Sequence, residues 1–331
     1  MLQIGILNVH LSFIRLLYVY SSESKMMEDY TFIDRLGHGS FGKVWKAKRN
    51  SDGKTLAIKE INYSSLGIKE RKMFVNEVNI LRKLHNPYIV RYYDHYINRS
   101  EKKIFLIMEL CAGGDLQTFI RETRSKLTTI GEDQIWLTFS ELALALKDCH
   151  YGPSKVLHRD IKPGNVFIDS EGHVKLGDFG LARCLNSTVD FATTCIGTPF
   201  YMSPEMNNGK YDEKSDIWAL GCVVYEMAAL RAPFQGFGIE DLKKHICKGD
   251  LQRFPDQYSD ALWKIVSRML DKDPAKRPTV LDILNYRNVA LTVKMNKVRK
   301  ELENVREKTA DLMKKKQRLM RRGIRKNRIE M

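Results

Sequence analysis

The stretch His158–Asn165, which reads HRDIKPGN, is followed at short range by Asp178–Gly180, which reads DFG. These two segments decide how the rest of the chain is interpreted. A three-letter match alone often arises by chance. Here one loop holds a His, an Arg, an Asp and an Asn in a single pattern, and an acidic turn follows it. The combination predicts a catalytic site rather than two solvated polar turns.

The residue types suit the transfer of a phosphoryl group. This chemistry needs a carboxylate near the attacking hydroxyl, oxygen ligands for a metal beside the phosphates, and positive charge. We expect Asp160 to orient the hydroxyl and accept its proton, and Lys162 to reach the transferred phosphate. Asn165 and Asp178 supply hard oxygen ligands, which suit Mg²⁺, with Mn²⁺ as a second choice.

Composition describes a soluble globular protein with room for one large domain or two lobes. The chain has 331 residues, of which 43% are hydrophobic and 29% charged. Its net charge of +15 is concentrated at one end, because residues 294–331 hold 15 Lys and Arg against 5 Asp and Glu. The globular part is therefore only mildly basic.

The cysteine pattern argues against a zinc site and against a disulfide framework. No C-x-x-C pair and no accompanying His cluster occurs. In a chain of this length we expect reduced thiols, as in the cytosol or nucleus. The six cysteines are Cys111, Cys149, Cys184, Cys195, Cys222 and Cys247.

Residues 1–29 form an apolar N-terminal extension. The segment has neither a basic n-region nor a clear cleavage site, and Arg15 fits poorly inside a spanning helix. We interpret it as an alternative start before Met26 or Met27, disordered or loosely packed. A membrane anchor is the alternative interpretation.

A glycine-rich segment, Gly37–Val44, lies between the first two of three strands expected within residues 30–61. A G-x-G-x-x-G pattern alone is weak, and it also occurs where a Rossmann strand enters a helix. Here a β-rich run follows the last glycine, which favours a strand–loop–strand flap that covers phosphates; an ordinary hairpin is the alternative. The glycines are Gly37, Gly39 and Gly42.

Lys59 closes the third strand and is the expected phosphate-binding lysine. The helix expected over residues 69–84 places Glu77 on its apolar face, four residues from both Met73 and Leu81. A carboxylate on a buried face needs a cation, so we predict a Lys59–Glu77 pair. In the alternative, Glu77 lies at the edge of the apolar stripe in water.

Strands are expected over residues 88–97 and 103–109, and the chain then reads ELCAGGD. We place an interlobe hinge here, with a smaller lobe over residues 30–111 and a larger lobe over 112–286. The backbone of Glu109 and Cys111 is predicted to pair with an adenine ring, and Asp115 with a ribose hydroxyl. Met108 is expected to wall the adenine pocket, although an ordinary core methionine is equally consistent.

Helices are predicted for most of the larger lobe, over residues 132–150, 214–230, 240–248, 259–270 and 279–284. The second of these is apolar nearly all round, so it is expected to be buried. Asp216 near its start then needs partners, for which we predict backbone N–H groups of the catalytic loop. Arg277 is the predicted partner of Glu205.

Residues 180–205 are threonine-rich and fit a segment ordered by phosphorylation. We predict Thr194 as the phosphorylated residue, with Thr193 second, and Arg159 as the clamp for the phosphate. Thr198 is predicted to stay unmodified and to bond Asp160 and Lys162. The alternative is that these threonines are simply solvated.

The tail, residues 287–331, carries a heptad seam over residues 291–319 that predicts a homodimeric coiled coil. Two polar positions weaken it, so a single amphipathic helix that packs on the globular part or lies free remains the alternative. The basic run near its end suits nuclear import or an acidic surface, and a solvated basic face is the alternative. The seam consists of Leu291, Met295, Val298, Leu302, Val305, Thr309, Leu312, Lys316 and Leu319.

From about residue 30 to 284 the chain resembles eukaryotic Ser/Thr protein kinases, and among them the NIMA-related family. The matching strings are EVNILRKLHNPYIVRYY (77–93), LALALKDCH (142–150), VLHRDIKPGNVFID (156–169), VKLGDFGLAR (174–183), GTPFYMSPE (197–205) and YDEKSDIWALGC (211–222). The apolar extension is foreign to the family pattern, and because the sequence stops soon after the seam we expect the family's regulatory tails to be missing.

The resemblance implies an α+β, two-lobed fold with an antiparallel sheet in the small lobe and a mainly helical large lobe. It implies ATP in the cleft, Mg²⁺-dependent phosphorylation of Ser/Thr in protein substrates, and Val44, Ala57 and Phe167 around the nucleotide. Family members act in the cell cycle and at centrosomes, microtubules or cilia, so we expect a cytoplasmic protein that also reaches the cytoskeleton, centrosome or nucleus.

Two other functions compete with this prediction. The chain could be an ATP-binding scaffold without catalysis, although such proteins usually lack one of Lys59, Asp160, Asn165 and Asp178, and all four are present. Alternatively, the basic helix is the working part and binds the cytoskeleton or a nucleic acid. The tail lacks aromatic residues on which bases could stack.

Overall fold

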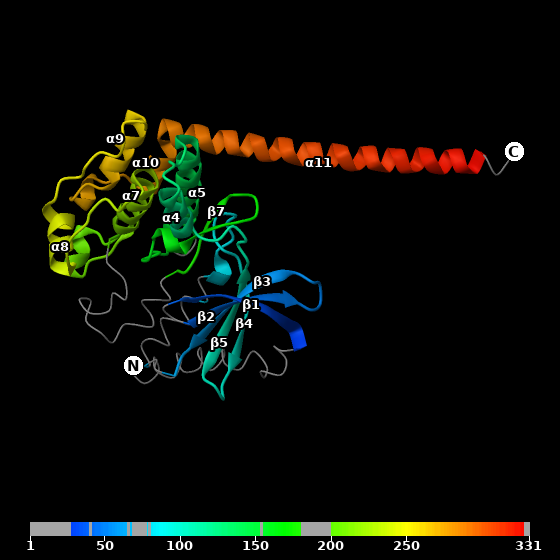
Figure 1. The fold of residues 1–331 in the computed structure, drawn as a ribbon, viewed down its shortest axis with the longest axis horizontal. Coiled ribbons are helices and arrows are strands. Elements are labelled where there is room, and N and C mark those ends of the chain that lie inside the picture. The colour runs from blue at the N-terminus through cyan, green and yellow to red at the C-terminus, as the bar shows by residue number, and fades with distance from the viewer. Residues whose placement is uncertain are drawn as a thin grey trace.

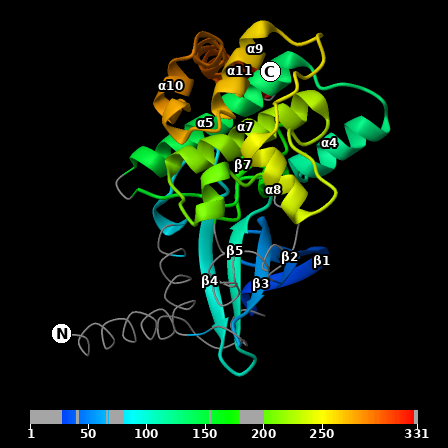
Figure 2. The same ribbon diagram turned by 90° about the vertical axis from the view of Figure 1, so that its left-hand side faces the viewer.

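The computed structural model describes residues 28–39, 42–64, 67, 78, 81–152, 155–179 and 200–327, and the N-terminal extension before residue 28 lies outside these ranges. A β-sheet lobe and a larger helical lobe lie one below the other, and a long helix leads away from the helical lobe (Figure 1). Viewed from the side, the sheet and the helices again separate into two bodies (Figure 2). The expected two-lobed α+β fold is confirmed.

The small lobe is one antiparallel sheet with the strand order β1-β2-β3-β5-β4. Its strands are β1 (Tyr30–Gly39), β2 (Gly42–Arg49), β3 (Thr55–Asn62), β4 (Tyr92–Asn98) and β5 (Lys103–Glu109). Residues 56–59 of β3 are all buried, so buried and exposed side chains do not alternate there. The reason is that both faces of this central strand are covered. One face packs a small core of Tyr30, Ala47, Leu56, Ile58, Tyr96 and Ile107.

The strand expected from residue 88 begins only at Tyr92, and this corrects the prediction. The four residues before it turn toward the large lobe: Ile89 forms a parallel bridge with Leu176, and Val90 N–H donates to the Leu176 carbonyl at 3.0 Å. An apolar run of this kind fits a strand of the small sheet and a segment that pairs with the large lobe equally well. Only the tertiary structure shows which of the two these residues form.

The large lobe contains α4 (Leu116–Ser125), α5 (Glu132–Tyr151), α7 (Glu213–Ala229), α8 (Ile239–Lys248), α9 (Asp260–Met269) and α10 (Val280–Asn285), with the short strands β6 (Val166–Ile168) and β7 (Val174–Leu176) and the 3-10 turns η1 (Pro163–Asn165), η2 (Pro204–Asn208) and η3 (Pro274–Lys276). The five predicted helices are present, and each of their ends lies within one residue of the prediction. Sequence analysis missed α4.

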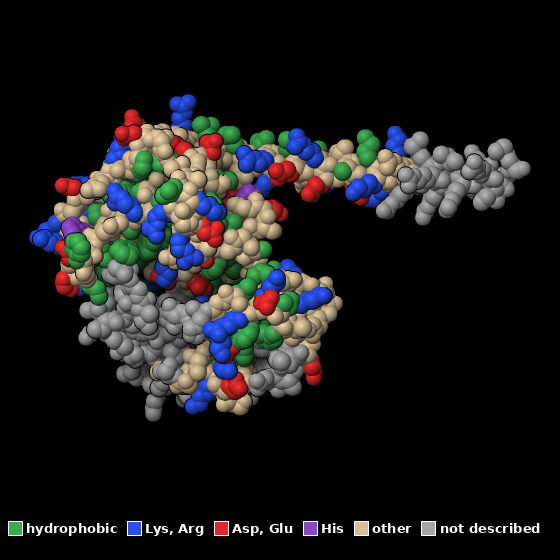
Figure 3. Space-filling model, in the orientation of Figure 1, with side chains coloured by type: hydrophobic (Ala, Val, Ile, Leu, Met, Phe, Trp, Pro, Cys, Tyr) green, Lys and Arg blue, Asp and Glu red, His purple; other side chains and the backbone are tan. Residues whose placement is uncertain are grey.

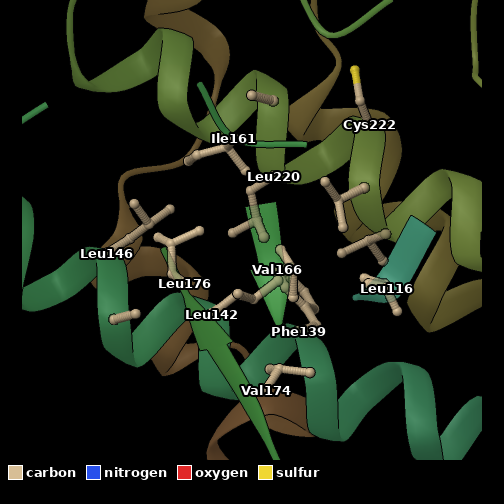
Figure 4. Packing of buried hydrophobic residues seen from close by; sticks show 14 of the residues in the cluster. Leu116, Phe139, Leu142, Leu146, Ile161, Val166, Val174, Leu176, Leu220 and Cys222 are labelled. Atoms are coloured by element: carbon tan, nitrogen blue, oxygen red, sulfur yellow. The ribbon is translucent and has the colours of Figure 1, made fainter. Parts of the chain in front are cut away.

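Helix α7 is buried almost completely, as its apolar composition predicts. It begins with a capping box in which Asp212 and Ser215 satisfy each other's backbone N–H groups. Side chains of α5, α7, β6 and β7 pack together in the core of the large lobe, and Ile161 of the catalytic loop packs among them (Figure 4). The loop is therefore anchored on the hydrophobic core of the large lobe.

The tail is one helix, α11 (Arg287–Asn327). Hydrophobic side chains remain exposed along it among charged ones (Figure 3). Six of the predicted seam residues are between 47% and 64% exposed: Leu291, Met295, Val298, Leu302, Val305 and Leu312. No helix within the described ranges combines the length and the apolar character needed to cross a bilayer.

Candidate active site

The catalytic loop brings two of the predicted residues into contact with the carboxylate of a third, Asp160. Lys162 Nζ lies 2.8 Å and 3.1 Å from the two carboxylate oxygens of Asp160, and Asn165 Nδ2 donates to Asp160 Oδ2 at 2.8 Å. The turn η1 brings Asn165 back toward Asp160, whose backbone carbonyl also accepts from Asn165 Nδ2 at 2.7 Å. This carboxylate is held in one orientation beside a cation.

An ion pair joins the two lobes across the site. Lys59 Nζ of β3 lies 2.7 Å from Asp178 Oδ1, which follows β7. The lysine side chain is 4% exposed and the aspartate side chain 33% exposed, so a buried cation meets a carboxylate that still faces solvent. Asp178 adopts the left-handed backbone region, φ 54°, which is unusual for a non-glycine residue and often marks functional sites.

His158 ties the catalytic loop to this acidic turn. Its Nδ1 accepts from the backbone N–H of Asp160 at 3.3 Å, and its Nε2 donates to the Gly177 carbonyl at 3.0 Å. One neutral tautomer satisfies both bonds, and burial lowers the pKa of His158, which keeps the ring neutral. The ring also contacts Phe179, with centroids 4.4 Å apart. Asp160 and Asp178 are thus positioned relative to each other.

Asp216 supports the same loop from below, as predicted. Its carboxylate accepts from the backbone N–H groups of His158 at 3.0 Å and Arg159 at 3.1 Å, from His150 Nε2 at 2.8 Å, and from the Tyr211 hydroxyl. Burial alone would raise the pKa of Asp216, but these donors lower it, so the carboxylate stays charged.

The predicted Glu205–Arg277 pair is also present. Two bonds of 2.8 Å join the guanidinium to the two carboxylate oxygens. The Arg277 side chain is fully buried and that of Glu205 is 12% exposed. Burial opposes ionisation, yet the bonds from Arg277 and Ser215 lower the pKa of Glu205 to about 2. This bidentate pair ties the end of the threonine-rich segment to η3.

Strand register brings together the residues expected around a nucleotide. Val44 pairs with Lys59 across β2 and β3, and Ala57 pairs with Met108 across β3 and β5. Ala57 and Lys59 are two residues apart, so they share one face of β3. Gly42 has φ +152°, and a Cβ there would lie 1.7 Å from the Glu60 carbonyl oxygen. The flap closes by antiparallel pairing of Gly37 with Val44 and of Gly39 with Gly42, so no helix follows the glycines.

Hydrogen bonds and an ion pair of the Glu109 and Asp115 side chains fix the hinge between the lobes. Glu109 accepts from the Arg91 backbone N–H at 3.1 Å and pairs with Lys175 at 3.1 Å. Asp115 caps α4 by accepting from the Thr118 N–H at 2.8 Å, and it bridges to Phe167 of β6. Burial raises the pKa of Cys111 to about 12, so this thiol is not poised as a nucleophile.

Several predicted residues lie outside the described part of the chain: Glu77, Thr193, Thr194 and Thr198. The Lys59–Glu77 pair and the phosphorylation sites therefore stay predictions. Arg159 is described; its side chain is exposed, and its guanidinium lies over the Tyr211 ring at 6.0 Å.

Sequence reasoning missed two features of the site. The cap formed by Asp115 could have been found from the Asp-x-x-Thr pattern before an apolar run, which is typical of a helix start. The contacts of His158 with Gly177 and Phe179 had no local signal, because they join segments about 20 residues apart through packing.

Comparison with known proteins agrees with this geometry. Residues 30–288 match the model of the protein kinase domain. The chain is 44% identical over 288 residues to a protein named probable serine/threonine-protein kinase nek2 from Dictyostelium discoideum, which covers 86% of the chain and 69% of that protein.

Two further relatives place the family. The human serine/threonine-protein kinase Nek2 is 48% identical over 261 residues, which are 78% of this chain and 59% of that protein. The G2-specific protein kinase nimA of Emericella nidulans is 39% identical over 284 residues, with 78% and 40% covered.

The chain is a NIMA-related Ser/Thr protein kinase. It spans between two fifths and about two thirds of the length of these three relatives. In this NIMA-related kinase the matched region contains both lobes and the whole site described above, whereas most of α11 lies beyond the kinase-domain match.

Proposed function

We propose that this NIMA-related kinase transfers the γ-phosphate of ATP to Ser or Thr hydroxyls of protein substrates. One observation carries the proposal: the Lys59–Asp178 pair of 2.7 Å lies beside a loop in which Lys162 and Asn165 converge on the Asp160 carboxylate. Phosphoryl transfer depends chiefly on positioning and charge stabilisation, and this arrangement supplies both.

Each residue then has a defined role. Asp160 orients the substrate hydroxyl and accepts its proton, and its bonds to Lys162 and Asn165 hold it in place. Lys162, whose side chain is 40% exposed, can leave the carboxylate to meet the transferred phosphate. Lys59 contacts the phosphates farther from the hydroxyl and adds positive charge.

The residues present fit a magnesium ion. Asp178 offers a carboxylate that is partly open to solvent, and both side-chain bonds of Asn165 come from Nδ2, which leaves the amide oxygen as a ligand. Hard oxygen donors of this kind are what Mg²⁺ prefers, and Mn²⁺ accepts them too. When bound, the ion would offset charge on the phosphates.

We place ATP between the flap and β3. The backbone at Gly37, Gly39 and Gly42 covers the phosphates, while Val44, Ala57 and Met108 enclose the adenine from three adjacent strands. The remaining contacts are assigned to the backbone at Glu109 and Cys111, to the Asp115 side chain, which also caps α4, and to Phe167 beneath them.

Regulation is proposed to act through charge on the threonine-rich segment. Phosphate on Thr194 would meet the exposed Arg159, and Glu77 would hold Lys59 toward the nucleotide. Thr198 would bond Asp160 and Lys162. These contacts extend the loop that Asp216 already supports.

The function is tested with the purified chain, MgATP and an array of peptides containing Ser, Thr or Tyr. We expect label on Ser and Thr peptides only, and loss of labelling when EDTA removes the metal. Transfer to Tyr alone, or none to any peptide under activating phosphorylation, would contradict the proposal.

We further propose that α11 forms a homodimer through its exposed seam. Substituting Val305→Lys should place a charge in the seam and reduce the molar mass measured by light scattering from dimer to monomer. Asn304→Lys adds the same charge on an exposed residue outside the seam and should leave the mass unchanged. A wild-type monomer would remove the dimer proposal.

The basic end of α11 favours an acidic partner such as a microtubule surface or a centrosomal protein. Lys314, Lys315 and Lys316 follow one another along α11, and all three are exposed. Together with the cell-cycle names of the relatives, this supports a role in the cell cycle, in the cytoplasm and at the cytoskeleton, centrosome or nucleus.

A further inference from the structure

The start of α11 packs on the large lobe with the face that lies away from the seam. Val289 is fully buried, Val293 packs against the main core, and Asn296 is 6% exposed. These positions repeat at helical spacing, and helix α11 contacts α5, whereas Leu291 and Met295 are exposed to solvent. Docking on the lobe and pairing through the seam therefore use different sides of one helix.

Asn296 is the polar centre of this contact. Its Nδ2 donates to Glu141 Oε1 of α5 at 3.1 Å and to the Tyr88 hydroxyl at 3.4 Å. One turn later, Lys300 Nζ lies 5.1 Å from the centroid of the Tyr88 ring. A hydrogen-bonded amide in an otherwise apolar contact specifies one register for the helix.

The two partners of Asn296 both hold strand β7. Glu141, 1% exposed, accepts from the Val174 N–H through Oε2 at 2.9 Å and pairs through Oε1 with His173 Nδ1 at 2.6 Å. The Tyr88 carbonyl accepts from the Leu176 N–H at 2.8 Å. Strand β7 ends two residues before Asp178, so groups that fix β7 also fix where the acidic turn begins.

We propose that Asn296 is a positioning residue that latches α11 onto Glu141 and Tyr88, and that the latched helix holds β7, and through it Asp178, in the arrangement used for catalysis. Residues 287–300 then work as part of the catalytic lobe. The catalytic half of this inference rests on the proposed kinase function, and the docking half does not.

The latch is balanced so that it can open. Asn296 Oδ1 is buried and has no hydrogen-bond partner among the described residues. An unpaired buried acceptor offsets part of what the two donated bonds contribute. The helix beyond residue 300 is exposed, so a partner can bind there. Binding of such a partner would compete with the weak contact of Asn296 with Glu141 and Tyr88.

The test uses the full chain with Asn296→Asp, which sets a second carboxylate against Glu141. Burial already raises the pKa of Glu141, so another negative charge there is unfavourable. We expect tryptic cleavage after Lys294 and Lys297 to rise at least tenfold, with cleavage after Lys314 unchanged. We also expect kcat to fall severalfold while KM for the peptide stays constant.

Two further variants separate the latch from a general loss of stability. Gln317→Glu makes the same amide-to-acid change at an exposed position of α11 and should alter neither readout. Asn296→Asp combined with Glu141→Gln restores a donor opposite the new acid, so cleavage should return toward wild type; kcat is not compared in this variant, because Glu141 also accepts from His173 and from the Val174 N–H.

Unchanged cleavage in Asn296→Asp, or failure of the double variant to restore it, would overturn the latch. Release of the helix with kcat unaffected would overturn its link to β7. If the wild-type chain transferred no phosphate, the proposed function would fall, while the cleavage pattern would still report on docking.

Discussion

Asp178→Asn is expected to reduce phosphate transfer by at least about 10³-fold, which corresponds to roughly 4 kcal/mol of lost transition-state stabilisation. The amide keeps the shape of the side chain and an oxygen that can accept from Lys59 Nζ, now 2.7 Å away. It lacks the negative charge that makes the carboxylate a strong ligand for Mg²⁺. The measurement is the rate of label transfer to a Ser peptide at saturating MgATP.

Its matched control is Asp256→Asn, because the Asp256 side chain is completely exposed. This variant should retain the wild-type rate. The control should unfold at the wild-type temperature. Asp178→Asn should unfold at a lower temperature, because the buried Lys59 cation loses its anionic partner, so the rates are compared at a temperature at which both variants are fully folded. Full activity in Asp178→Asn would refute the assignment of this residue as a metal ligand.

Arg277→Leu is expected to destabilise the fold by about 3–5 kcal/mol, because it leaves the nearly buried Glu205 carboxylate without its cation. The guanidinium also donates to the carbonyl of Asp271 at 2.8 Å and lies 4.9 Å from the Trp218 ring centroid, so packing is lost as well. Urea unfolding at pH 7 measures the change. A loss below 1 kcal/mol would contradict the structural role given to the pair.

Arg253→Leu is the control for this prediction. Arg253 pairs with Asp260 at 2.6 Å, but the two side chains are 37% and 90% exposed. Exposed pairs contribute about 0–1 kcal/mol, so this variant should be nearly neutral. The contrast tests burial rather than the number of ion pairs.

The same pair predicts a pH dependence. The pKa of Glu205 is about 2 in the folded protein against an ordinary value of 4.5, so the folded state binds this proton less tightly than the unfolded state. The carboxylate thus contributes stability above pH 4.5 that is lost as the pH falls toward 2. Between pH 7 and pH 4 the stability difference between wild type and Glu205→Gln should shrink by roughly 1 kcal/mol. A constant or growing difference would contradict the low pKa.

Particular elements show how far sequence reasoning reached in the fold. Helix α7 was predicted to be buried because apolar residues surround the whole helix. A helix without a polar face is not stable when one side is exposed to water. The strand expected from residue 88 began at Tyr92, because an apolar run does not reveal which lobe it will pair with. Helix α4 was missed because its start was read only as a hinge.

The site shows the same division. Asp160, Lys162 and Asn165 lie within six residues of one another, so their convergence on one carboxylate follows from a short turn. Their nucleotide partners, the phosphorylated threonine and the pairing of Glu77 with Lys59 stay predictions from the motif.

The amino-acid sequence by itself determined the family, the two lobes, the catalytic loop and the heptad pattern of the tail, because each is written in local spacing and side-chain chemistry. Only the tertiary structure decided that Lys59 meets Asp178, that His158 joins the loop to the acidic turn, and that Asn296 reaches Glu141. These contacts join residues between 19 and 155 positions apart. They form only when the packed core brings distant segments together, so nothing in the neighbouring sequence specifies them.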